Sequence, residues 1–287
     1  MHAHALRDFI GRHERLFVLT GAGCSTDSGI PDYRDADGGW KRSPPVTLQA
    51  FLADAATRRR YWARSMLGWR RFGRAQPNAV HRALAMLETL GRQQVLLTQN
   101  VDRLHQRAGS RNVIDLHGRM DVVRCLACGE RSDRDVLQEA LLARNPGWID
   151  VESRPAPDGD ADLASVDYSG FDVPGCARCG GLLKPDVVFF GENVPRERVE
   201  SALEHLALAD ALLVVGSSLM VYSGFRFARM AAQSGKPIAA VNLGRTRADD
   251  LLSLKIDRSC ADALAFLLSP TSIADAERAH GIPLAAD

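Results

Sequence analysis

Two pairs of cysteines form the clearest chemical pattern in the sequence. Cys125 and Cys128 are separated by two residues, as are Cys176 and Cys179, and a glycine follows each pair. Thiolates at this spacing can converge on one ion, and two such pairs complete a tetrahedral site for Zn²⁺. Four thiolates leave no open position for water, so the predicted zinc is structural rather than catalytic. Redox-active dithiols are the alternative interpretation.

One histidine, His117, follows the apolar stretch 113–116 and precedes a glycine. Imidazole is the side chain best suited to accept a proton near neutral pH, so a general base is one interpretation and a structural histidine is the other. A second apolar run ends just before Gln99, Asn100 and Asp102. Polar side chains that can orient a substrate therefore accompany the histidine, which favours the catalytic interpretation.

A glycine-bearing loop, residues 20–25, follows an apolar run and precedes a predicted helix. Its two glycines would let the backbone turn tightly and approach a pyrophosphate. Thr26 stands where the usual dinucleotide fingerprint has a third glycine, and no acidic residue follows about 20 positions later at a second strand end. A hydride-transferring dehydrogenase is therefore not favoured. A glycine turn without a ligand is the alternative, and the rigid segment 29–34 behind it could cover a ligand or be a structural turn.

Four short apolar runs predict the buried parallel strands that must position these groups. The runs are Leu16–Thr20, 94–98, Ala211–Val215 and 237–241. Helical periodicity at 80–90 and 195–209 completes the alternation expected of a doubly wound α/β sheet. Ligands of such sheets bind beyond the carboxyl ends of the strands. Polar or glycine-bearing clusters follow all four runs, so we expect one shared site.

The stretch 120–182 breaks this alternation of strands and helices. It holds both cysteine pairs and an acidic, proline-bearing segment, 150–172, that predicts a long surface loop. We therefore expect a small zinc-binding module inserted into a larger domain made of residues 1–119 and 183–287. A helical excursion at about 34–77, rich in aromatic residues, is assigned to the larger domain.

The bulk composition excludes several classes of protein. The 287 residues are 46% hydrophobic and 25% charged, with a net charge of +1, so a nucleic-acid partner is not expected. Arginines concentrated between positions 58 and 74 predict a solvated helix face. No apolar run approaches the roughly 20 residues of a membrane-spanning helix. The first residues lack an apolar signal core, so we expect the cytoplasm, or an organelle matrix if a leader had been removed.

An ordered set of motifs resembles the sirtuin family. The motifs are GAGCS (21–25), GIPDYR (29–34), TQNVD (98–102), LHG (116–118), the two cysteine pairs, KPDVVFFGE (184–192), GSSL (216–219) and VNLG (241–244). The similarity extends from about position 16 to about position 268. The stretches 60–72, 156–160 and 214–227 are similar to the class II branch of that family.

The resemblance implies a Rossmann-type NAD-binding domain with a small zinc domain, and an NAD-dependent protein-lysine deacylase that consumes NAD. In such a reaction the acyl oxygen of a modified lysine attacks C1′ of the nicotinamide ribose, and nicotinamide leaves. His117 would then deprotonate a ribose hydroxyl, and Asn100 and Asp102 would orient the ribose and the carboxamide. The products would be free lysine, nicotinamide and O-acyl-ADP-ribose. The implied partner is an acyl-lysine protein or peptide, without a membrane or a nucleic acid.

The resemblance also implies which residues contact NAD. They are Gly21, Ala22, Gly23, Ser25, Ile30, Pro31, Asp32, Tyr33, Arg34, Gln99, Asn100, Val101, Asp102, Gly216, Ser217, Ser218, Asn242, Leu243, Gly244 and Cys260. Within this set, Ala22, Ile30, Asp32 and Val101 would line the pocket for nicotinamide.

A substrate peptide would add as a strand beside the apolar run 187–190, which is itself predicted to be a strand. The implied contacts are Val188, Phe189, Phe190, Gly191 and Glu192. Tyr61 and Arg64 have the Tyr-x-x-Arg spacing that recognises acidic acyl groups in the class III branch, because a guanidinium can bind a carboxylate through two hydrogen bonds. We therefore expect a pocket that accepts acyl chains beyond acetyl, including carboxylated or lipoyl-like ones.

Three other functions stay open at this point. The same NAD-binding residues could serve mono-ADP-ribosyl transfer to protein, or an NAD-sensing module with little turnover. A zinc-ribbon nucleic-acid binder is the third, and the near-neutral charge disfavours it.

Overall fold

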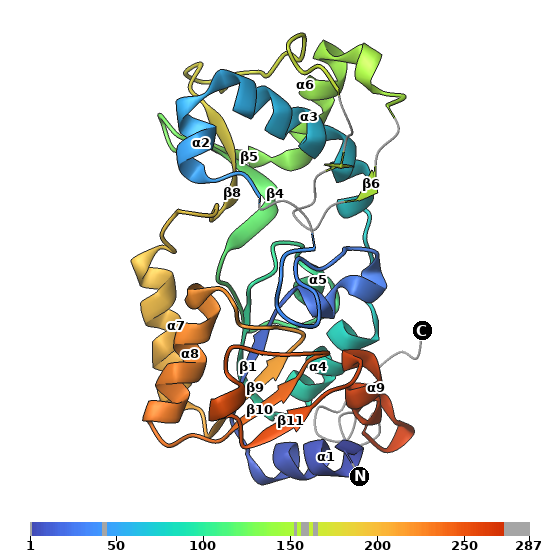
Figure 1. Cartoon of the computed structure of the whole chain (residues 1–287), viewed down its shortest axis with the longest axis vertical. Coiled ribbons are helices and arrows are strands. Elements are labelled where there is room, and N and C mark those ends of the chain that lie inside the picture. The colour runs from blue at the N-terminus through green and yellow to red at the C-terminus, as the bar shows by residue number, and fades with distance from the viewer. Residues whose placement is uncertain (1, 42–44, 152–153, 156–160, 163–165, 273–287) are drawn as a thin grey trace.

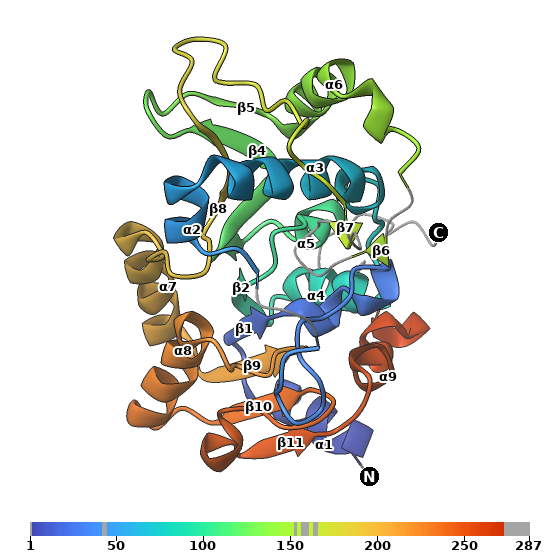
Figure 2. The ribbon, with the colours of Figure 1, turned by 45° about the horizontal axis from the view of Figure 1, so that its top comes forward.

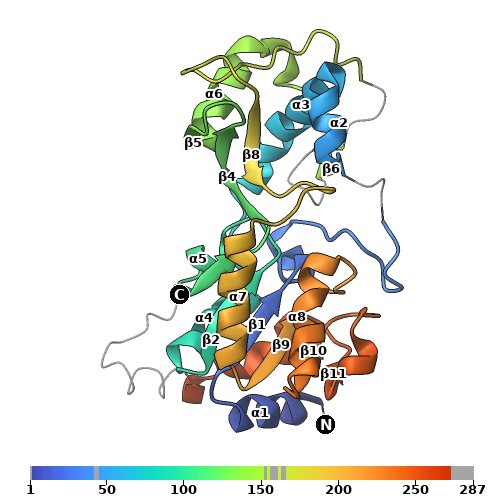
Figure 3. The ribbon, with the colours of Figure 1, turned by 90° about the vertical axis from the view of Figure 1, so that its left-hand side faces the viewer.

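The computed structural model describes residues 2–41, 45–151, 154–155, 161–162 and 166–272. These residues form two lobes joined by a narrow waist (Figure 1, Figure 3). The larger lobe holds a parallel sheet between layers of helices, and the smaller lobe holds an antiparallel sheet with helices of its own.

A six-stranded parallel sheet forms the centre of the larger lobe, in the order β11-β10-β9-β1-β2-β3. The strands are β1 (Leu16–Thr20), β2 (Gln93–Thr98), β3 (Val113–Asp115), β9 (Ala211–Val215), β10 (Ile238–Val241) and β11 (Leu254–Ile256). Every residue of β1 and β9 is buried, as expected of strands covered on both faces. The four predicted strands are confirmed, because each predicted bound lies within about one residue of the observed one.

The central strands end level with one another. Thr20 of β1 pairs with Thr98 of β2 and Val215 of β9, and Val215 pairs in turn with Val241 of β10. The residues that follow these four positions therefore meet at one edge of the sheet, where parallel α/β folds bind ligands.

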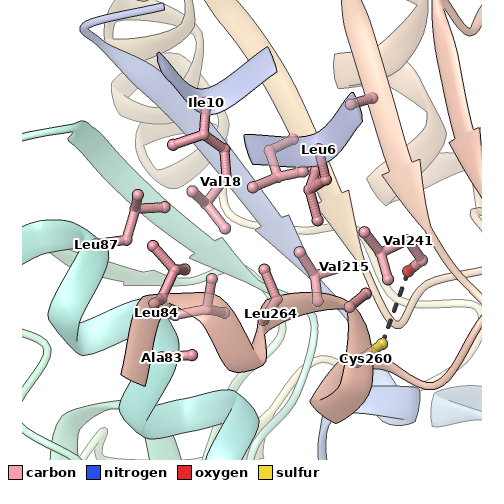
Figure 4. Close-up of a cluster of buried hydrophobic side chains, with 14 of the residues drawn as sticks. Leu6, Ile10, Val18, Ala83, Leu84, Leu87, Val215, Val241, Cys260 and Leu264 are labelled. Atoms are coloured by element: carbon pink, nitrogen blue, oxygen red, sulfur yellow. Dashed lines mark hydrogen bonds between the residues drawn. The ribbon is translucent and has the colours of Figure 1, made fainter. Parts of the chain in front are cut away.

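Helices cover both faces of this sheet (Figure 2). On one face lie α1 (His2–Arg12), α4 (Ala79–Thr89) and α9 (Cys260–Leu264), and on the other lie α7 (Arg196–Leu208) and α8 (Tyr222–Gln233). Leu6 of α1, Leu84 of α4 and Leu264 of α9 converge on the strands in the core of the first face (Figure 4). The expected doubly wound, Rossmann-type arrangement is therefore confirmed.

The smaller lobe is built on a three-stranded antiparallel sheet in the order β5-β4-β8. Its elements are β4 (Gly118–Cys125), β5 (Arg131–Asp133), α6 (Arg134–Arg144) and β8 (Leu183–Val187). Two helices from the earlier excursion, α2 (Leu48–Ala53) and α3 (Ala55–Phe72), pack onto this lobe. Phe51, Trp62 and Met66 from these helices share a core with Val123 and Leu141. The sequence predicts helices in this excursion. The lobe on which α2 and α3 pack, however, is determined by contacts with residues much later in the chain.

Short elements complete the described chain. They are α5 (Leu104–Arg107), the paired strands β6 (Arg154–Pro155) and β7 (Ala161–Asp162), and the 3-10 turns η3 (Pro146–Trp148), η4 (Asp249–Leu251) and η5 (Ala265–Leu268). The predicted surface loop 150–172 lies partly outside the described residues, and the motif 156–160 lies wholly outside them.

The glycine loop is not followed by the predicted α-helix. Two 3-10 turns, η1 (Ala22–Cys24) and η2 (Thr26–Ser28), stand in its place. Gly29 ends the second turn at φ +82°, a left-handed conformation that does not continue a right-handed helix.

The strand predicted over 187–190 is also wrong beyond its first residue. β8 ends at Val187, and Phe190 makes only an isolated bridge with Thr47. The chain turns at Gly191, whose φ of +77° is not a strand conformation.

Candidate active site and metal centre

A cavity of about 400 Å³ opens beyond the carboxyl ends of the parallel strands, with walls from both lobes. This volume lies within the range of small-molecule sites. The larger lobe contributes the glycine loop, the segment after β2 and the loops after β9 and β10. The smaller lobe contributes part of α3, Met120 of β4 and the turn after β8. The strand-end clusters therefore do meet around one space.

His117 lies at this cavity with both ring nitrogens engaged. Nδ1 lies 2.9 Å from the carbonyl oxygen of Gln99, and Nε2 lies 2.8 Å from Oγ of Ser223. A carbonyl can only accept, so Nδ1 carries the hydrogen and Nε2 keeps its lone pair. Burial lowers the pKa of His117 to about 4; the Gln99 hydrogen bond opposes this shift, and the charges of Arg198 and Arg226 add to it. The imidazole is therefore neutral near pH 7 and offers Nε2 as a proton acceptor.

A hydrogen-bonded network joins the glycine loop to the segment after β2. Oγ of Ser25 donates to Asp102 at 2.7 Å and accepts from Nδ2 of Asn100 at 3.1 Å. Asn100 also donates to the carbonyl oxygen of Gly21 at 3.1 Å. Burial raises the pKa of Asp102, while hydrogen bonds from the Leu104 backbone and Ser25 act to lower it. The network fixes an amide and a carboxyl group in place at the cavity wall.

Two buried histidines lie beneath that network. Nε2 of His81 lies 3.5 Å from Oγ of Ser25, and Nε2 of His105 lies 3.0 Å from Oγ1 of Thr20. The two rings are 4.8 Å apart, and burial is the main cause that lowers the pKa of each, to about 4 for His81. Sequence reasoning missed this pair, because both residues lie within helices and carry no motif of their own.

Glycines allow the glycine loop to pack against the loop after β9. The Gly23 N–H donates to the carbonyl oxygen of Gly216 at 2.9 Å. A Cβ at Gly21 would lie 2.8 Å from Cβ of Ser217, and a Cβ at Gly216 would lie 2.5 Å from the backbone nitrogen of Cys24. Side chains at these positions would force the two loops apart.

The turn after β8 holds the residues predicted to bind a peptide. Oε2 of Glu192 accepts from the backbone N–H of Phe189 at 2.9 Å and from Nζ of Lys184 at 3.0 Å. Burial lowers the pKa of this lysine, and the ion pair with Glu192 opposes the shift. The Val188 N–H donates to the carbonyl oxygen of His117 at 2.7 Å. The turn is therefore fixed directly to the backbone of the histidine.

Apolar side chains line the part of the cavity that belongs to the smaller lobe. They are Tyr61, Phe72, Met120, Val187 and Phe189. Arg64, one turn along α3 from Tyr61, is not among the lining residues. The structure thus brings Tyr61 to the cavity but not its predicted partner.

All but three of the residues predicted to contact NAD line the cavity. The exceptions are Pro31, Gly244 and Cys260. Cys260 is buried in the core, with its Sγ 3.7 Å from the carbonyl oxygen of Val241.

Several lining residues carried no prediction. Trp40 lines the cavity and stacks under Arg34, whose guanidinium carbon is 3.5 Å from the ring centroid. Ser223 and Arg226 reach the cavity from the first turns of α8. No spacing in the sequence around Ser223 and Arg226 indicates a contact with a histidine so distant in the chain.

The four predicted metal ligands form one cluster in the smaller lobe. Their Sγ atoms lie within 4.8 Å of one another, with Cys125 3.5 Å from Cys179 and Cys128 3.8 Å from Cys176. A tetrahedron with Zn–S bonds of about 2.3 Å has edges of about 3.8 Å, so the four thiols fit Zn²⁺. The expected zinc-binding module is therefore supported by the arrangement of its ligands.

Comparison with known proteins agrees with this architecture. The model of the Sir2 family matches residues 21–223. A Xanthomonas campestris protein named NAD-dependent protein deacetylase is 68% identical over 93% of this chain and 91% of its own length. A Bradyrhizobium diazoefficiens protein named NAD-dependent protein deacetylase 2 is 65% identical, over 92% and 97%.

Solved structures of Sir2 are also similar to this chain. A structure of Sir2 with a deacetylated p53 peptide and 3′-O-acetyl-ADP-ribose superposes with a TM-score of 0.76 at 30% identity, covering 95% of this chain and 99% of that one. Sir2 bound to an acetylated peptide gives 0.73 at 29% identity, over 93% and 98%. Fold and site together are those of a two-lobed α/β enzyme with a four-cysteine module. The chain belongs to the Sir2 family, which confirms the predicted sirtuin; its assignment to the class II branch stays a prediction.

Among the described residues, no helix is both long enough and apolar enough to span a membrane.

Proposed function

We propose that the chain is an NAD-dependent protein-lysine deacylase. Relatives that are 62–68% identical carry the name NAD-dependent protein deacetylase, which confirms the predicted class of enzyme. The observation that carries the proposal is the state of His117. Its imidazole is neutral, held in one tautomer by the Gln99 carbonyl, and lies in the same cavity as the Asn100 and Asp102 network.

The residues of this chain would divide the work in the following way. NAD, when bound, supplies the electrophilic C1′ of its nicotinamide ribose. Asn100 and Asp102 orient the nicotinamide half, and Gln99 contacts the ribose, because hydrogen bonds fix all three side chains at the cavity that His117 also lines. His117 then takes the proton of a ribose hydroxyl at Nε2. One water molecule is consumed as the lysine amine departs and the acyl group stays on ADP-ribose, so lysine, nicotinamide and O-acyl-ADP-ribose are the products.

The adenosine half of NAD would lie over the ends of β9 and β10. Ser217 and Asn242 follow these strands and line the cavity, so both can contact the sugar. The side chain of Cys260 lies in the core behind them, so only the backbone of this residue would contact the adenosine half.

The four-cysteine cluster would hold Zn²⁺ in a purely structural role. The cluster lies between the β4 and β8 segments of the smaller lobe, and none of its cysteines lines the cavity. The metal would therefore maintain the lobe that carries the substrate turn.

The substrate would be an acyl-lysine in an extended peptide laid along the turn 188–192. The apolar walls around Tyr61 and Phe189 support acyl chains longer than acetyl. Since Arg64 does not line the cavity, the walls favour uncharged chains over carboxylated ones. A series of acyl-lysine peptides, from acetyl to lipoyl and including a carboxylated chain, tests this through kcat/KM. A clear preference for acetyl would contradict the proposed acceptance of longer acyl chains but would leave the proposed deacylase function intact.

Mass spectrometry of the reaction with NAD and that peptide series tests the function. We expect free lysine, nicotinamide and O-acyl-ADP-ribose in equal amounts. His117→Tyr should reduce this turnover by at least about 100-fold, since a general base contributes roughly 10²–10⁴ in rate. Transfer of label from NAD to protein without loss of an acyl group would favour ADP-ribosyl transfer instead. NAD that binds but is never consumed would favour the sensing module.

A cytoplasmic location is part of the same proposal. Fractionation of cells that produce the untagged chain, followed by immunoblotting, should find it in the cytoplasmic fraction; recovery from membranes or the medium would contradict the proposal.

A further inference from the structure

The first turn of α8 contacts the proposed general base. α8 begins at Tyr222, and the second residue of the helix, Ser223, places its hydroxyl 2.8 Å from Nε2 of His117. This is the nitrogen that must receive the substrate proton. Nothing in the roles assigned above uses this serine.

The direction of this hydrogen bond is determined by the other side of the ring. Nδ1 of His117 donates to the carbonyl oxygen of Gln99, so Nε2 has no hydrogen and can only accept. The hydroxyl of Ser223 is therefore the donor. The imidazole is held between a backbone acceptor and a side-chain donor, which sets both its tautomer and its orientation.

The following residue explains how the helix comes so close. A Cβ at Gly224 would lie 2.4 Å from Oε1 of Gln99, so only glycine leaves the space that this side chain occupies. The same helical turn thus packs against Gln99 and donates to His117. A displacement of the first turn of α8 would therefore change the contacts of both His117 and Gln99, whose carbonyl oxygen fixes the tautomer of the histidine.

Ser223 is not needed to begin the helix. The N-cap position is Val221, which makes no side-chain capping bond, and Ser223 directs its hydroxyl to the histidine. Ser223 therefore does not act as a cap of the helix.

We propose that Ser223 is a positioning residue for His117 that stabilises the imidazole both before and after proton transfer. The inference rests on the proposed deacylase function. In the resting enzyme the hydroxyl donates to the lone pair of Nε2. Nε2 has a single lone pair, so the serine O–H turns away before the ribose O–H reaches this nitrogen. When the ribose O–H bond breaks, its proton forms the new Nε2–H bond and its electron pair stays on the ribose oxygen. The serine oxygen then accepts from Nε2–H, and the serine itself gains and loses no proton.

Nearby positive charges disfavour the imidazolium that forms after proton transfer, so this state needs a hydrogen-bond acceptor. Arg198 and Arg226 both act against a positive charge on His117. Nε of Arg226 is buried and has no hydrogen-bond partner among the described residues, and Arg198 donates to the carbonyl oxygen of Leu116. An imidazolium formed in the presence of these two positive charges needs an acceptor at Nε2, and an alanine at position 223 could not supply one.

The test compares Ser223→Ala and Ser223→Thr with the wild type in the full-length enzyme. Two rates are measured with the same acetyl-lysine peptide. One is the exchange of labelled nicotinamide into NAD, which requires only the steps before His117 acts. The other is the formation of deacylated peptide, which requires the proton transfer. Ser234→Ala, at the exposed C-terminal end of α8, is the matched control and should change neither rate.

For Ser223→Ala we expect deacylation to fall by about tenfold, the value of one hydrogen bond, with nicotinamide exchange changed by less than about twofold. Ser223→Thr keeps a hydroxyl and should recover most of the lost rate. Equal deacylation by the alanine variant and the wild type would overturn the proposal. A parallel loss of both rates, not recovered by threonine, would show a structural role only. A wild type without exchange or deacylation would instead refute the deacylase function.

Discussion

Two buried histidines and the half-buried His117 connect the chemistry of the site to the stability of the fold. The pKa of His81 and that of His117 are each lowered to about 4, mainly by burial, and that of His105 is also lowered. All three are neutral in the folded chain at pH values where the unfolded chain already binds protons. A neutral base is what the proposed reaction needs, so the burial that favours the chemistry makes the fold sensitive to acid.

The free energy of unfolding should therefore fall as the pH falls from about 6.5 to about 4. In this pH window the histidines bind protons in the unfolded state but not in the folded state. Each such histidine lowers the free energy of unfolding by roughly 1.4 kcal/mol per pH unit. Urea unfolding at several pH values measures the slope. His81→Gln should make the slope smaller, whereas replacement of the exposed His4 is the control. An unchanged slope in the His81 variant would show that this histidine is not held neutral.

At the scale of elements, the four central strands of the parallel sheet could be predicted from the sequence, and the contacts between elements could not. β1 and β9 have the predicted bounds because each is a short, mainly apolar run between a charged residue and a glycine, which leaves few other interpretations. The predicted end of β8 was wrong, since the strand ends at Val187 although the apolar run continues to Phe190, just before the turn at Gly191. Ser223 is a polar residue at a helix start and has no pattern that distinguishes it from a surface position. Its function depends on the packing of α8 against the end of β2.

Gly224 provides an element-scale test of that packing. Gly224→Ala should leave the melting temperature nearly unchanged, because the colliding atom is the end of a side chain and alanine favours a helix. It should nevertheless displace Gln99 from its 2.7 Å hydrogen bond to Ser217 and raise the KM for NAD by about tenfold.

The matched control for this variant is Gly11→Ala in α1, where an added Cβ meets nothing within 4 Å. It should stabilise the fold by about 0.5–1 kcal/mol and leave the kinetics unchanged. If Gly224→Ala bound NAD normally, close packing of α8 on Gln99 would not matter for the site.

At the scale of the whole molecule, the two lobes have separate cores. The core of the smaller lobe contains Trp62 and Trp69 of α3, and the four-cysteine cluster lies in the same lobe. Structural metal sites contribute folding free energy directly. The stability of this lobe should therefore depend on the metal, while the parallel sheet has its own apolar layers on both faces.

Removal of zinc by a chelator should split thermal unfolding into two transitions, with the smaller lobe melting first. Tryptophan fluorescence should report the first transition and calorimetry both. Cys176→Ser should have the same effect, and added Zn²⁺ should restore a single transition in the wild type only. A melting curve that is indifferent to chelation would contradict the zinc assignment.

The place of His117 in the waist has a mechanical consequence. Gly118 pairs with Val187 at the junction of β4 and β8, and the Val188 N–H bonds to the His117 carbonyl, so the base lies where strands pass from one lobe to the other. A Cβ at Gly118 would lie 2.1 Å from the carbonyl oxygen of Asp186, so the two backbones touch there. A point on an axis of rotation does not move. If the lobes pivot about this crossing, the rims of the cavity sweep through the largest arc while the imidazole stays where it is, so substrates can enter and leave without misaligning the base.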